Sequence, residues 1–120
     1  MLCLTALVII LPAAPLPPAT DAERFPDYET AQRGAMQWHA TLDAQRYLRP
    51  HRAEEGLAAL AEASRRLELW QAVATMQYLR DSGEECDAWS GETVRESLAW
   101  LRETLGPQDY ARGQLPSPVP

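Results

Sequence analysis

Lysine and asparagine are both absent from this chain of 120 residues, and its eleven basic residues are all arginine. Without lysine there is no Schiff-base chemistry on a side-chain amine, and without asparagine there is no Asn-linked glycosylation. Seventeen acidic residues outnumber the arginines and give a formal net charge of −6 at pH 7. Because an acidic surface repels phosphate backbones, we expect no nucleic-acid partner.

Cysteine and β-branched residues are also scarce. If the N-terminal apolar run that contains Cys3 were removed, Cys86 would have no partner for an intrachain disulfide. Isoleucine occurs only within that run, and the only valines beyond it are Val73, Val94 and Val119. The sequence also lacks an alternating apolar pattern, so no β-sheet is expected and the predicted fold class is all-α.

No apolar run is long enough to cross a membrane as a helix. The run Leu2–Leu11 has ten residues, where about 20 are needed. Ten apolar residues followed by the Pro-rich stretch 12–20 match a secretory signal peptide, with Ala14, Ala19 and Ala22 as cleavage positions. We therefore expect a periplasmic or secreted protein. The alternatives are an uncleaved membrane anchor and a cytoplasmic protein whose terminus is disordered or packed on the fold.

Three segments carry apolar residues at helical spacings of three and four. The first follows the N-cap residue Asp27 and is predicted to run from Tyr28 to about Leu48. The second is predicted from about His51 to Ser82, and the third from Asp87 or Ser90 to Leu105. The apolar stripes are Tyr28, Ala31, Ala35, Trp38 and Leu42; then Leu60, Ala63, Leu67, Trp70 and Ala74; then Val94, Leu98, Leu101 and Leu105.

Glycine and proline mark the limits of these segments. Pro50 either kinks one long helix or separates two. Gly83 is predicted to end the second helix in a left-handed conformation, and Gly106-Pro107 to end the third. One further turn is expected at Gln108–Arg112. The three alternating prolines of residues 113–120 then favour an extended tail.

These segments predict an antiparallel helical hairpin or a three-helix bundle with an extended Pro-rich C-terminal tail. Residues 1–20 form the signal-peptide-like segment and Pro-rich linker, residues 21–112 the helical domain, and residues 113–120 the tail. The sequence holds no Gly-x-Ser-x-Gly turn, no Gly-rich phosphate loop and no Cys-x-x-Cys-His motif. We therefore expect neither an enzyme nor a bound cofactor.

Two pairs of residues have the spacing of metal ligands on a helix. His39 and Asp43 are four residues apart, and so are His51 and Glu55. A metal site needs three or four converging ligands, which would require the two pairs to meet across Pro50. The simpler interpretation is that both pairs lie on solvated helix faces, so no metal is expected.

Four tryptophans and the tail are the candidates for partner binding. Trp38 and Trp70 lie on apolar stripes and are predicted to be core residues. Trp89 and Trp100 lie off the stripes, and either they seal the edge of the core or they are exposed and anchor a partner. In the tail, Leu115, Pro116 and Pro118 have the composition of a short Pro-rich ligand, although chain ends of this composition are often simply disordered.

The segment RESLAWLRETLGPQDYARGQLPSPVP at residues 95–120 resembles small bacterial proteins that end in a Leu-rich helix followed by Gly-Gln-Leu-Pro. No activity and no site residue follow from this resemblance. The leading hypothesis is a non-enzymatic, exported helical protein that binds an unidentified protein partner or itself. The alternatives are a metal- or ligand-binding helical module and a subunit held at a membrane by an uncleaved Leu2–Leu11 segment.

Overall fold

The computed structural model describes residues 15–48, 53–83 and 87–117. These residues form a short 3-10 helix and four α-helices, with no β-strand among them. The elements are η1 at Ala19–Arg24, α2 at Tyr28–Leu48, α3 at Ala53–Asp81, α4 at Ala88–Leu105 and α5 at Pro107–Arg112. The prediction of an all-α fold is confirmed, and the predicted helix limits agree to within two residues.

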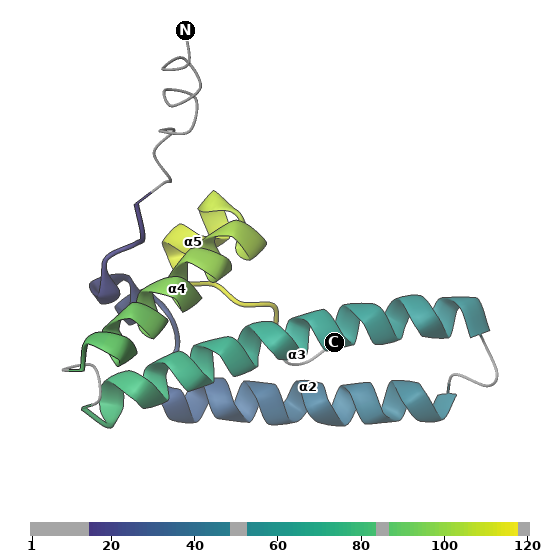
Figure 1. Cartoon of the computed structure of the whole chain (residues 1–120). Helices are drawn as coiled ribbons and strands as arrows, with labels where there is room; N and C mark the ends of the chain where they lie inside the picture. Colours follow the sequence, from purple (N-terminus) through teal and green to yellow (C-terminus); the bar gives the residue numbers. More distant parts are fainter. Residues whose placement is uncertain (1–14, 49–52, 84–86, 118–120) are drawn as a thin grey trace, which may run out of the picture.

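The two longest helices, α2 and α3, run antiparallel and side by side (Figure 1). Helix α4 packs on α3, and α5 follows it after a sharp turn. The expected hairpin is therefore present, with α4 packed across it. Residues 49–52, which include Pro50, lie outside the described residues, while the helices on either side of them are separate elements.

The helices begin and end where the capping chemistry of the sequence places them. The Asp27 carboxylate accepts a hydrogen bond from the backbone N–H of Thr30 at 2.9 Å and caps α2. Gly83 follows α3 with a φ of +78°, which only glycine adopts without strain. Gly106 has a φ of +87° and ends α4, and Pro107 then takes the first position of α5.

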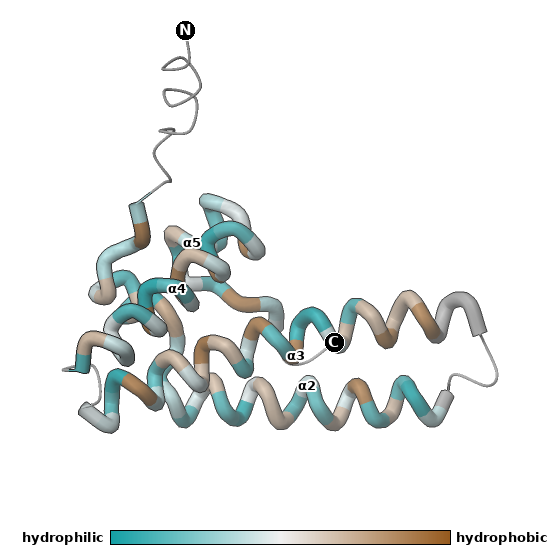
Figure 2. Tube along the Cα trace, viewed as in Figure 1, coloured by the Kyte–Doolittle hydropathy of each residue, from teal (hydrophilic) through white to brown (hydrophobic). Residues whose placement is uncertain are grey.

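The core lies on both sides of α3, because this helix carries two buried stripes. One stripe faces α2, and the other includes Leu69, Val73 and Met76, which are fully buried. Figure 2 shows hydrophobic and hydrophilic positions interspersed along the helices, which is typical of helices that pack on one side and meet solvent on another. The buried residues of the predicted stripes are Ala31, Ala35, Trp38, Leu42, Ala63, Leu67, Trp70, Ala74, Val94, Leu98 and Leu101.

The N-terminal segment differs from the prediction. We expected residues 12–20 to form a linker outside the helical domain, but Pro17 is fully buried and η1 begins at Ala19. Ala22 and Phe25 also belong to the core. Among the described residues, the packed body therefore includes Pro17 and η1, although the helical domain was expected to begin at residue 21. A Pro-rich stretch can pack as well as link, because proline buries apolar surface and gives up little conformational entropy.

A buried side chain of α3 fixes this segment to the body. The amide nitrogen of Gln77 donates hydrogen bonds to the carbonyl oxygens of Ala22 at 2.8 Å and of Pro26 at 3.1 Å. Its oxygen accepts a hydrogen bond from Arg80 at 3.1 Å. Only 4% of Gln77 is exposed, so its amide group depends on these hydrogen bonds to satisfy its buried donor and acceptor.

Helix α5 holds the other side of η1. The Tyr110 hydroxyl donates a hydrogen bond to the Asp21 carboxylate at 2.9 Å, and its ring meets that of Phe25 edge-on at 5.6 Å. The guanidinium of Arg24 lies over the Tyr110 ring at 5.3 Å and pairs with Asp21 at 3.3 Å. Burial, followed by the hydrogen bond to Asp21, raises the pKa of Tyr110 to about 12.

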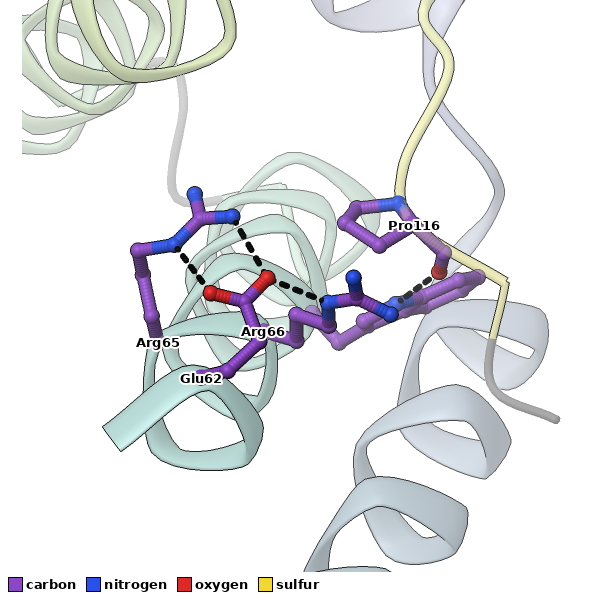
Figure 3. Close-up of polar contacts among 5 residues, drawn as sticks. Glu62, Arg65, Arg66 and Pro116 are labelled. Atoms are coloured by element: carbon purple, nitrogen blue, oxygen red, sulfur yellow. Dashed lines mark hydrogen bonds and ion pairs between the residues drawn. The ribbon is translucent and has the colours of Figure 1, made fainter. Parts of the chain in front are cut away.

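The described part of the C-terminal tail also packs on the body. Leu115 is 8% exposed and belongs to the core. The carbonyl oxygen of Pro116 accepts a hydrogen bond of 2.7 Å from the indole N–H of Trp70 (Figure 3). Residues 113–117 are thus tied to α3, since burying one apolar side chain and satisfying one indole N–H both favour the packed position. Pro118 lies outside the described residues.

Candidate binding face

A hollow of about 650 Å³ lies between α2 and α3. Its α2 wall carries Tyr28, Gln32, Ala35, Met36 and His39, and its α3 wall carries Gln71, Ala74, Thr75 and Tyr78. The rings of Tyr28 and Tyr78 meet across one end at 5.7 Å. Each wall follows the three-to-four spacing of residues along one helix face, just beside the buried stripe.

A second hollow, of about 510 Å³, lies between α3 and α4. Its lining residues are Glu68, Gln71, Ala72, Thr75, Thr93, Glu96, Ser97 and Trp100. Gln71 and Thr75 border both hollows, so the two lie on the same side of the molecule with α3 as the ridge between them. We call this three-helix surface, made of the residues that line the two hollows, the binding face.

Large apolar side chains are exposed along the whole width of the binding face. Met36 from α2 is 64% exposed, Tyr78 from α3 is 50% exposed and Trp100 from α4 is 40% exposed. Each of the three helices contributes one, and each lies beside a hollow. Single exposed apolar residues are ordinary, but a set gathered around two adjoining hollows is typical of a surface that binds something.

The charge of the binding face is negative. Glu68 and Glu96 line the second hollow, and no arginine is among the residues that line either one. In the described part of the chain neither carboxylate has an ion pair, and the arginines nearest to them in sequence pair with other carboxylates. Arg65 and Arg66 both bind Glu62, at 3.0 and 2.7 Å (Figure 3), and Arg95 binds Glu92 at 3.2 Å.

The metal-ligand candidates do not meet in the described residues. His39 and Asp43 form an exposed pair at 3.4 Å, and Arg46 approaches the same carboxylate. His51 and the side chain of Glu55 lie outside the described residues. Across the described ranges, no group of three or more His, Cys, Asp or Glu side chains has the arrangement of a metal site.

The partner-binding candidates have different outcomes. Trp89 is 66% exposed and Trp100 is 40% exposed, so neither seals the core. Only Trp100 borders a hollow on the binding face. Leu115 and Pro116 instead pack against the body and line a third, polar hollow of about 420 Å³ with Arg65, Thr104 and Asp109. In this structure both residues are part of the packed body.

Sequence reasoning missed Met36 and Tyr78 on the binding face. Both follow the buried stripe by one helical position: Met36 follows Ala35, and Tyr78 follows the buried Gln77. The sequence signal that could have identified them is the width of the apolar stripe on α2 and α3. Each stripe is wider than one packed helix can cover, so a large apolar residue at its edge is left exposed.

Within the described ranges, every helix is too short or too polar to cross a bilayer. The chain is a small all-α protein built on an antiparallel hairpin. Comparison with protein-family models, with curated proteins and with solved structures gives no match.

Proposed function

We propose that this chain is a non-enzymatic helical protein that acts by protein–protein interaction through the binding face. The observation that carries the proposal is the position of Met36, Tyr78 and Trp100, one exposed apolar residue on each of three helices around two adjoining hollows. Exposed aromatic residues and methionines are enriched at interfaces, where desolvating them provides much of the binding energy. The partner is either a different protein or a second copy of this chain.

Site-specific photo-crosslinking in the cells that make the protein tests the proposal. A benzophenone amino acid replaces Tyr78, and a second variant carries it at Tyr47, which is 88% exposed on α2 but lines neither hollow. We expect a discrete adduct of higher mass from position 78 and none from position 47. The same adducts from both positions, or no adduct from position 78, would contradict the proposal.

We also propose that the protein is exported, on the strength of the apolar run Leu2–Leu11. Burial of Pro17 and Ala22 favours cleavage near Ala14 over cleavage at Ala19 or Ala22, since the later cuts would remove residues that pack in the body. The intact mass of the protein in each cell fraction tests this. A full-length product in the cytoplasm would contradict export.

A further inference from the structure

We propose that the partner segment is a basic amphipathic helix that seats its apolar stripe between α2 and α3 and directs its Lys or Arg side chains to Glu68, Glu96 and Trp100. This inference rests on the proposed function and names the chemistry of its partner. It concerns the binding face alone and requires no change in the fold.

The first hollow has the length and shape of a helix site. On α2 its lining extends from Tyr28 to His39, and on α3 from Gln71 to Tyr78. At 1.5 Å per residue these stretches are about 16 and 10 Å long, which corresponds to two or three turns of a third helix. Small residues, Ala35 and Ala74, form its floor, and small residues permit the close approach of a helix.

The rim of this hollow is apolar or neutral. Met36 and Tyr78 stand at its walls, with Gln32, Gln71 and Thr75 as the polar neighbours. His39 also lines this hollow, and its imidazole forms an exposed pair with the carboxylate of Asp43 at 3.4 Å. A helix with leucine or another apolar residue at i, i+3, i+4 and i+7 would cover this surface without burying a charge.

The second hollow supplies the charge that selects the partner. A residue at the flank of the seated helix reaches over the Gln71–Thr75 ridge into the space bordered by Glu68, Glu96 and Trp100. An arginine or lysine there meets an exposed indole and two carboxylates that form no ion pair with any described residue, so ion pairing and cation–π contact act together. A glutamate at the same place would meet like charge, which excludes acidic helices.

Charge also argues against a second copy of this chain as the occupant. The protein has a net charge of −6, and no described arginine lines the binding face. A two-fold dimer through this face would bring Glu68 and Glu96 of both copies to one interface without an arginine among the lining residues to pair with them. A basic segment from a different protein complements the same surface.

Three 18-residue helical peptides of matched length test the inference by fluorescence anisotropy on the full chain. The first has a leucine stripe flanked by lysines, the second replaces those lysines with glutamates, and the third has the composition of the first with the stripe scrambled. We expect the first to bind at least about tenfold more tightly than either of the others, with an affinity that falls as salt rises.

Two double variants locate the effect. Glu68→Gln/Glu96→Gln should weaken the lysine peptide about tenfold and leave the glutamate peptide unchanged or slightly tighter. Glu29→Gln/Glu103→Gln changes the net charge equally at exposed carboxylates that line neither hollow, and should have little effect. Met36→Gln should weaken the lysine peptide about fivefold through the apolar half of the site. Circular dichroism of each variant confirms that it is folded.

Four results would overturn the inference. They are equal binding of the lysine and glutamate peptides, equal binding of the patterned and scrambled peptides, equal losses in the two double variants, and a dimer in sedimentation that Met36→Arg dissociates. The last would make a second copy the occupant. The crosslinking experiment tests the proposed function separately. A specific adduct from position 78 would support protein–protein interaction even if the inference about a basic helix fails, and the absence of that adduct would contradict the proposed function itself.

Discussion

The indole ring of Trp70 in α3 lies against the backbone of Gly34 in α2, at the place where a β-carbon would project from residue 34. A methyl group there would overlap atoms Cε3 and Cζ3 of the ring. The other edge of the same indole donates its N–H to Pro116. Trp70 therefore joins α2, α3 and the tail, and Gly34 is the residue that lets the two long helices approach around it.

Gly34→Ala should destabilise the protein by about 1 to 3 kcal/mol, because the added methyl group overpacks the interface with Trp70. The sign is informative, since alanine normally stabilises a helix interior relative to glycine by about 1 kcal/mol. Urea denaturation of Gly34→Ala, Trp70→Ala and the double variant measures the coupling. If Gly34→Ala is as harmful without the Trp70 ring as with it, the contact is not the cause.

Leu115→Ala should cost about 2 to 3 kcal/mol of unfolding free energy, although the residue lies five positions from the end of the chain. The reason is that Leu115 is buried in the core, next to the Pro116 contact with Trp70. Leu57→Ala provides the matched control, because Leu57 is 50% exposed, and it should cost less than about 1 kcal/mol. Equal costs would mean that the tail does not pack on the body.

Gln77→Met should destabilise the protein by about 1 to 3 kcal/mol, because the carbonyls of Ala22 and Pro26 lose their buried donor. The effect should be local as well as global, with faster tryptic cleavage after Arg24 in the native state. Gln37→Met, at an exposed position of α2, serves as the control. An unchanged cleavage rate at Arg24 would show that Gln77 does not hold the N-terminal segment.

Stability should fall between about pH 10 and pH 12. The pKa of Tyr110 is raised from 10.0 to about 12 in the folded state, so the folded protein holds this proton more tightly than the unfolded chain. The contribution is complete below pH 10 and is lost as pH rises toward 12, by up to roughly 2 to 3 kcal/mol.

Urea denaturation at a series of alkaline pH values measures this loss. Tyr110→Phe should remove most of the pH dependence, while Tyr47→Phe, at a residue that is 88% exposed, should leave it intact. Absorbance of tyrosinate at each pH provides an independent readout. If Tyr110 of the wild type ionises together with the exposed tyrosines, burial and the hydrogen bond to Asp21 do not raise its pKa, and this prediction is wrong.

The sequence by itself determined the helices and their limits. Helix limits depend on residues that are close together in the sequence, and such residues can be recognised without a structure. The signals here are the three-to-four spacing of apolar residues, the Asp27 cap, Gly83 and Gly106-Pro107. The burial of Trp38 and Trp70 followed from the same spacing, because a residue on the apolar stripe of a packed helix is buried.

The tertiary structure alone decided which parts distant in sequence meet. The hydrogen bond of Gln77 to Ala22 spans 55 residues, and that of Tyr110 to Asp21 spans 89. No spacing rule predicts such contacts, since they depend on how α3, α4 and α5 come together. The same packing buried Pro17 and Leu115, which composition alone assigns to a linker and a tail. It also left Met36, Tyr78 and Trp100 on one face, because α3 can be covered by α2 and α4 on only two of its sides.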